Sequence, residues 1–211
     1  MKRLLVLVIL SWFLVIWGPY ATSAQETDFD TQPATPELIQ ELQDGGFVLY
    51  MRHGPTDQSQ ADQYPGLDLD DCSTQRQLTQ EGREVAARVG EAIRKADIPL
   101  GEIISSPMCR CKNTAEAAFH TDFSTDEHLM YTAHLTEEEK EPKSRALREF
   151  LSQPVPKGQN RILVGHGPNM MDLMEYFVSP EGAVVVFQPE GDQEFEYLAT
   201  IAPGDWENLL P

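Results

Sequence analysis

Short apolar runs alternate along this chain with segments in which apolar residues recur every three or four positions. The runs predict buried strands, and the wider spacing predicts amphipathic helices. Strands are predicted at residues 47–51, 101–106 and 160–167, and a hairpin at 183–203 around a Glu190-Gly191-Asp192 turn. Helices are predicted at residues 35–45, 78–99, 107–119, 142–153 and 168–177. This alternation indicates an α/β fold, a three-layer α/β/α sandwich with a mostly parallel central sheet and a C-terminal edge hairpin.

Capping residues mark the ends of several helices. Thr35 and Thr79 are suited to accept hydrogen bonds from the first turns that follow them, and Gly45 is suited to end the first helix. Pro107 opens the third predicted helix, where proline fits the first turn. Residues 54–77 form a long polar stretch after the first strand, a length typical of a functional or mobile loop.

Residues 1–24 have the pattern of a secretory signal peptide. Two basic residues precede an apolar segment at 4–17, and small residues at 22–24 offer a cleavage site. The apolar segment is shorter than the ~20 residues that span a membrane, so we expect no stable membrane insertion after cleavage. An uncleaved anchor is the alternative. Residues 25–35 are predicted to be a polar tether, and residues 36–211 the folded domain.

The charge balance excludes some classes of partner. The chain has 34 acidic and 16 basic residues, with a formal net charge of −18. Such a surface repels nucleic acid and anionic membranes. A phosphorylated ligand would therefore require a local basic pocket, which makes the few arginines near strand ends informative.

Three junctions at the ends of predicted strands carry basic side chains. They are Arg52-His53-Gly54, then Ser105-Ser106-Pro107 with Arg110 one turn later, and finally Gly165-His166-Gly167. The carboxyl ends of parallel strands line the ligand crevice of an open α/β sheet. We therefore expect two arginines and two histidines to converge there, beside two helix N-termini that favour anions.

These side chains suit a phosphoryl group. Arginine binds phosphate oxygens through two parallel hydrogen bonds and stays charged. A neutral imidazole can attack phosphorus, and a second histidine can donate to an oxygen on which charge develops in the transition state. Gly54 and Gly167 would let the backbone come close to the ligand.

The three motifs resemble those of the histidine phosphatase superfamily, whose fold is phosphoglycerate-mutase-like. The motif RHG follows an N-terminal strand, the motif SSPMCRCKNTAE follows a middle strand, and the motif VGHG follows a late strand. The similarity covers about residues 45–202. The resemblance implies that His53 becomes phosphorylated. It also implies that Arg52, Arg110 and His166 complete the phosphate pocket.

Two further site residues depend on the resemblance alone. Many members carry a serine or threonine shortly after RHG, a place that Thr56 fills, whereas Ser59 stands where an asparagine is common. Mutase-type members carry an acid about twenty residues past the middle motif, and Glu137 is the candidate here. Another branch has an aspartate after its late histidine, where this chain has Gly167.

Three cysteines follow the predicted signal segment, namely Cys72, Cys109 and Cys111. An exported chain folds where disulfides form, and sequence spacing leaves Cys72 able to pair with either of the others. The resemblance to exported members that carry the motifs DDC and SSPxCR implies the Cys72–Cys109 pair. Cys111 is then a free thiol.

No metal or other cofactor is expected. His120, His128 and His134 are spaced too irregularly for a metal site, and the aspartates at 68–71 are expected to be solvated.

The predicted function is that of a metal-independent phosphomonoesterase, similar to histidine acid phosphatases, in the periplasm or outside the cell. A mutase with the same phosphohistidine is one alternative, and a phosphate-ligand-binding module without turnover is another. The expected partner is a small phosphorylated substrate. The resemblance includes exported members that act on envelope phosphates such as lipopolysaccharide core heptose phosphate.

Overall fold

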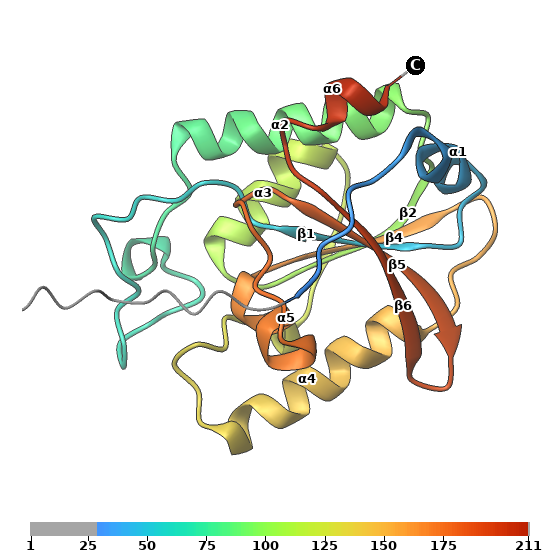
Figure 1. Cartoon of the computed structure of the whole chain (residues 1–211). Helices are drawn as coiled ribbons and strands as arrows, with labels where there is room; N and C mark the ends of the chain where they lie inside the picture. The colour runs from blue at the N-terminus through green and yellow to red at the C-terminus, as the bar shows by residue number, and fades with distance from the viewer. Residues whose placement is uncertain (1–28, 211) are drawn as a thin grey trace, which may run out of the picture.

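A six-stranded sheet organises residues 29–210, the part of the chain that the computed structural model describes (Figure 1). The strands are β1 (Val48–Arg52), β2 (Leu100–Ser105), β3 (Ser124–Thr125), β4 (Asn160–Gly165), β5 (Val184–Gly191) and β6 (Glu194–Ile201). Their spatial order is β3-β2-β4-β1-β5-β6, and the first four are parallel. β5 pairs antiparallel with β1 and forms the edge hairpin with β6. The predicted mostly parallel sheet and C-terminal hairpin are confirmed.

Helices cover both faces of this sheet. They are α1 (Pro36–Asp44), α2 (Gln80–Lys95), α3 (Cys109–Phe119), α4 (Glu137–Ser152), α5 (Gly167–Met174) and α6 (Trp206–Leu209), with short 3-10 turns at Cys72–Thr74 and Glu127–Leu129. One buried apolar cluster packs under α1, α2, α3 and α6, and the other under α4 and α5. Figure 1 shows α2 and α6 on one side of the sheet and α4 and α5 on the other. The three-layer prediction is therefore confirmed.

The central strand β1 shows why the apolar runs are continuous. Its residues alternate between the two clusters, with Leu49 and Met51 in one and Val48 and Tyr50 in the other. A strand covered on both faces requires apolar side chains at every position. Replacing a large buried side chain here by alanine should cost about 2–5 kcal/mol of stability.

Helix α4 begins at Glu137, and the predicted start at Pro142 is wrong. Thr136 caps the helix, and its side chain and that of Glu139 exchange hydrogen bonds with the first-turn backbone in a capping box. Such a box satisfies two backbone N–H groups that no helix can satisfy internally. Pro142 lies inside the helix, where it removes one backbone hydrogen bond.

The described part of the predicted polar tether lies against the hairpin. Phe29 stacks on Tyr176 with ring centroids 4.4 Å apart, and the N–H of Gln32 donates to the Tyr197 hydroxyl at 3.0 Å. This segment therefore adds apolar contact to the edge strand.

The predicted signal peptide, residues 1–24, lies outside the described residues, as do residues 25–28. Within residues 29–210, no helix has both the length and the apolar character that crossing a membrane requires.

Candidate active site

Three neighbouring strands end at the same edge of the sheet and carry the candidate site. The register pairs Arg52 of β1 with Gly165 of β4, and Ser105 of β2 with Val164 of β4. The alignment continues past the strand end, because the His53 N–H donates to the Gly165 carbonyl at 3.0 Å. Parallel pairing thus brings the three predicted junctions together.

His53 and His166 lie side by side at this edge. Their ring centroids are 5.3 Å apart in an edge-to-face arrangement, and both side chains are buried. Burial, reinforced by the nearby Arg110 guanidinium, lowers the pKa of each histidine well below its ordinary value. Both imidazoles are therefore neutral at neutral pH, the state in which a ring nitrogen has a lone pair for attack.

The His53 ring is held in one tautomer. Its Nδ1 lies 2.9 Å from the Gly54 carbonyl oxygen, which can only accept a hydrogen bond. Nδ1 therefore carries the proton, and Nε2 presents the lone pair. The His166 Nε2 in turn lies 3.0 Å from the Ser106 hydroxyl.

Tyr50 holds the backbone of His166. The His166 N–H donates to the Tyr50 hydroxyl at 2.7 Å, and this hydroxyl donates to the His166 carbonyl at 2.8 Å. A Cβ at Gly165 would lie 2.2 Å from the Tyr50 oxygen. Only glycine therefore admits the phenol that fixes the second histidine.

Arg110 is a buried charge with one carboxylate partner. Its Nη1 donates to Asp62 Oδ1 at 2.9 Å, and its guanidinium lies 5.1 Å from the centroid of the Tyr131 ring. Its Nε and Nη2 have no acceptor within residues 29–210. These two atoms form one edge of the guanidinium, which is thus left for an anion to bind.

Arg52 shows a similar arrangement. Its Nη1 donates to the Val178 carbonyl at 2.8 Å, and its Nη2 donates to Glu181 at 3.2 Å. Its buried Nε has no acceptor among the residues described. The Phe177 ring lies 5.0 Å from the guanidinium carbon. Both predicted arginines therefore have buried N–H groups to offer a ligand.

The predicted substrate-binding residues surround this set, but two of them already have protein partners. The Gly54 N–H donates to Thr114 Oγ1 at 3.0 Å, and the Thr56 hydroxyl donates to Glu181 at 3.1 Å. Gly167 is the first residue of α5 and follows His166 directly. The structure thus brings Gly54, Thr56 and Gly167 to the edge that carries the histidines.

Glu137 does not join the other predicted residues. Its side chain is 92% exposed and forms an ion pair with Lys140 at 3.1 Å. As the first residue of α4, it faces solvent, where a carboxylate at a helix N-terminus is stabilised by the helix dipole. The structure therefore gives this glutamate a helix-terminus position rather than one beside the histidines.

A disulfide joins Cys72 to Cys109, the pairing that the resemblance implies. It fastens the loop after RHG to the residue that precedes Arg110. Cys111 is a buried thiol whose sulfur lies 3.5 Å from His166 Nε2. Burial raises its pKa to about 12, so it remains protonated and unreactive.

Three side chains of the site escaped the sequence analysis, namely Asp62, Glu181 and Tyr131. Each lies in a loop and contacts Arg110 or Arg52. The only signal was indirect, because the loop that contains Asp62 was already expected to be functional from its length. In the described range, no group of three or more histidine, cysteine, aspartate or glutamate side chains is arranged to hold a metal ion.

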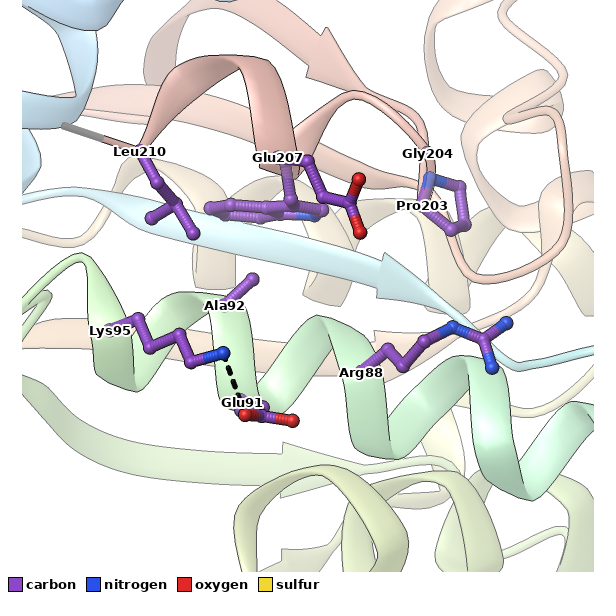
Figure 2. Close-up of a pocket in the computed structure, with 9 residues that line it drawn as sticks. Arg88, Glu91, Ala92, Lys95, Pro203, Gly204, Glu207 and Leu210 are labelled. Atoms are coloured by element: carbon purple, nitrogen blue, oxygen red, sulfur yellow. Dashed lines mark ion pairs between the residues drawn. The ribbon is translucent and has the colours of Figure 1, made fainter.

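A separate cavity of about 310 Å³ lies between α2 and the C-terminal segment (Figure 2). Figure 2 shows Arg88 and the Glu91–Lys95 ion pair of α2 opposite Glu207 and Leu210. Its lining contains none of the residues gathered at the strand ends. This cavity is therefore distinct from the candidate site at the sheet edge.

The fold and this edge place the chain among α/β proteins that gather a histidine pair and two arginines at the carboxyl ends of parallel strands. Residues 48–155 match the model of the histidine phosphatase superfamily (branch 1), and the chain belongs to this superfamily. A comparison with curated protein sequences finds no match.

Solved structures share the fold. The protein histidine phosphatase SixA complexed with tungstate is 14% identical, with 75% of this chain and 98% of that chain covered and a TM-score of 0.53. Phosphoserine phosphatase from Entamoeba histolytica with 3-phosphoglyceric acid is 16% identical, with 74% and 96% covered and a TM-score of 0.50. A mycobacterial hydrolase is 16% identical, with 72% and 95% covered and a TM-score of 0.50. These similarities confirm the predicted fold class.

Proposed function

We propose that the protein hydrolyses phosphomonoesters through a phosphohistidine on His53, in the periplasm or outside the cell. The observation that carries the proposal is the set of buried guanidinium N–H groups of Arg110 and Arg52 that have no acceptor in residues 29–210. Each such group costs at least about 1–3 kcal/mol when left without a hydrogen bond. A phosphoryl group supplies the missing acceptors, which supports a phosphate ligand at this position.

In the proposed reaction, His53 Nε2 attacks phosphorus and the bond to the ester oxygen breaks. The leaving oxygen takes a proton from solvent water and departs as the alcohol, and the phosphoryl group remains on His53; the water that attacks in the second step returns one proton to solvent. A water molecule then attacks phosphorus, the P–N bond breaks, and inorganic phosphate and neutral His53 are released. Arg52, Arg110 and His166 stabilise the charge that develops on the non-bridging oxygens.

The disulfide supports an extracytoplasmic location. Disulfides persist in oxidising compartments and are rare where thiols are kept reduced. Together with the signal-peptide pattern of residues 1–24, the Cys72–Cys109 bond favours export. The proposed substrate is a small phosphomonoester. An envelope sugar phosphate is one of the substrates to assay, because the resemblance includes exported members that act on envelope phosphates.

The test is phosphate release from p-nitrophenyl phosphate by the wild type and by His53→Ala. We expect turnover to fall by at least about a thousandfold in the variant, because covalent catalysis is lost. His128→Ala is the matched control, since His128 is exposed and, among residues 29–210, its ring pairs with the nearby Asp126. Circular dichroism and thermal unfolding establish that both variants fold.

Counting the products released per chain separates the alternatives to the proposal. A hydrolase gives many phosphate ions per chain, a mutase transfers the phosphoryl group to a second alcohol, and a binding module gives at most one p-nitrophenol per chain. Near-wild-type turnover by folded His53→Ala would show that the proposed nucleophile is wrong.

A further inference from the structure

A row of aromatic rings leads from the site histidines to the surface. The Tyr131 ring lies 5.4 Å from that of His166, the His134 ring lies 5.5 Å from Tyr131, and the Tyr64 ring lies 4.6 Å from His134. Tyr131 is half-buried beside Arg110, whereas His134 is exposed. The row therefore begins where the phosphoryl group binds and ends in solvent.

One exposed aromatic side chain is associated with each of the two site arginines. Within residues 29–210, the large apolar side chains with high exposure are Tyr64 and Phe177, each 41% exposed. Phe177 lies against Arg52, and Tyr64 is joined through the ring row to Tyr131 and Arg110. Exposed aromatic surface is informative when it gathers at one site, and here it flanks both phosphate-binding arginines.

The charges around this entrance restrict what these rings bind. The loop that supplies Tyr64 also supplies five carboxylates, of which Asp62 is paired with Arg110 and the other four are those of Asp57, Asp68, Asp70 and Asp71. A leaving group with a second negative charge would be repelled by them. A planar, uncharged ring avoids this repulsion and stacks on tyrosine and histidine faces regardless of its hydrogen-bonding pattern.

We propose that Tyr64, Tyr131, His134 and Phe177 form a leaving-group subsite that selects phosphomonoesters whose alcohol carries a planar, uncharged ring, as in a nucleoside monophosphate. The inference deepens the proposed function and rests on it. A ring attached directly to the ester oxygen meets Tyr131, and a ring one sugar further away meets His134 and Tyr64. A bare sugar phosphate fills the phosphoryl pocket but leaves this subsite without contacts.

Adenosine 5′-monophosphate and ribose 5-phosphate are the test pair. Both esters break at the same primary oxygen of ribose, so the leaving oxygen is chemically equivalent and the pair differs in the base. We expect the wild type to prefer the nucleotide by about tenfold or more in kcat/KM, the range that stacking on one aromatic side chain supplies. The preference should lie mainly in KM, because the ring contacts form in the ground state.

Tyr64→Ala should reduce this preference to near unity, and Tyr64→Phe should retain it, because the phenyl face remains. The position is exposed, so both variants should fold, which thermal unfolding verifies. Equal kcat/KM for the two substrates in the wild type, or an unchanged ratio in Tyr64→Ala, overturns the subsite. So does a protein that cleaves p-nitrophenyl phosphate but not the nucleotide. Failure with p-nitrophenyl phosphate itself overturns the proposed function, and the subsite with it.

Discussion

Removing the Cys72–Cys109 disulfide should both destabilise the protein and loosen its phosphate pocket. The bond spans a sequence separation of 37 residues, for which the chain-entropy model gives about 3.8 kcal/mol at 25 °C. Cys72 is exposed, whereas Cys109 is buried next to Arg110. Cys72→Ser therefore cuts the link and leaves the packing around Arg110 intact.

The expected effect on the site follows from the loop that the bond anchors. This loop supplies Asp62 to Arg110 at 2.9 Å and Gln75 to the Cys109 N–H at 2.8 Å. When the loop is released, the Arg110 side chain spends more time in other orientations. This weakens binding of the phosphoryl group. We expect KM to rise several-fold, together with the loss of stability.

The assay is urea unfolding of the wild type and Cys72→Ser, each with and without dithiothreitol. Reductant should lower the unfolding free energy of the wild type to that of the variant and should leave the variant unchanged. This comparison cancels the effect of reductant on the buried thiol of Cys111, which both proteins share. A difference below about 1 kcal/mol, with KM unchanged, would refute the reasoning.

Three other predictions follow from the buried arginines and histidines of the site. Asp62→Asn should lower the unfolding free energy by about 3 kcal/mol, because fully buried Arg110 loses its counter-charge, whereas the exposed Asp70→Asn should have no measurable effect. The unfolding free energy should fall as pH drops below about 6.5, because the unfolded chain then binds protons that buried His53 and His166 do not. The fall should reach at most about 2.7 kcal/mol per pH unit for the two histidines together. An unfolding free energy that urea unfolding finds constant between pH 5 and pH 7 contradicts this. Chelators should leave phosphate release unchanged and vanadate should inhibit it, whereas strict dependence on an added divalent ion contradicts the arginine-based site.

Much of the fold was predictable because its signals are local. The apolar run of β1 and the caps at Thr35 and Thr79 depend on residues within a few positions of one another. The histidines and arginines were predictable for a related reason, since each follows a strand whose end the sequence marks. Parallel pairing then brings those ends together without further information.

The remaining site residues could not be predicted from local sequence. Asp62 and Glu181 lie in loops, and their approach to the arginines depends on how those loops cross the finished sheet edge. Glu137 shows the converse, because its spacing from the middle motif fits an acid, yet its place at the start of α4 directs it to solvent. The spacing of residues along the sequence predicts where a side chain lies when it follows a strand, but not when a long loop intervenes.

The hydrogen bonds between Tyr50 and His166 would make the proposed turnover a measure of complete folding. The two residues are 116 positions apart in sequence, so these hydrogen bonds form only when β1 and β4 have paired in register. Proteins dominated by pairings between such distant segments fold slowly. A partly folded chain can contain α2 or the β5–β6 hairpin, but it has no assembled histidine pair. Activity regained during refolding therefore reports the fraction of fully assembled molecules. Circular dichroism of the helices also includes molecules that are only partly folded.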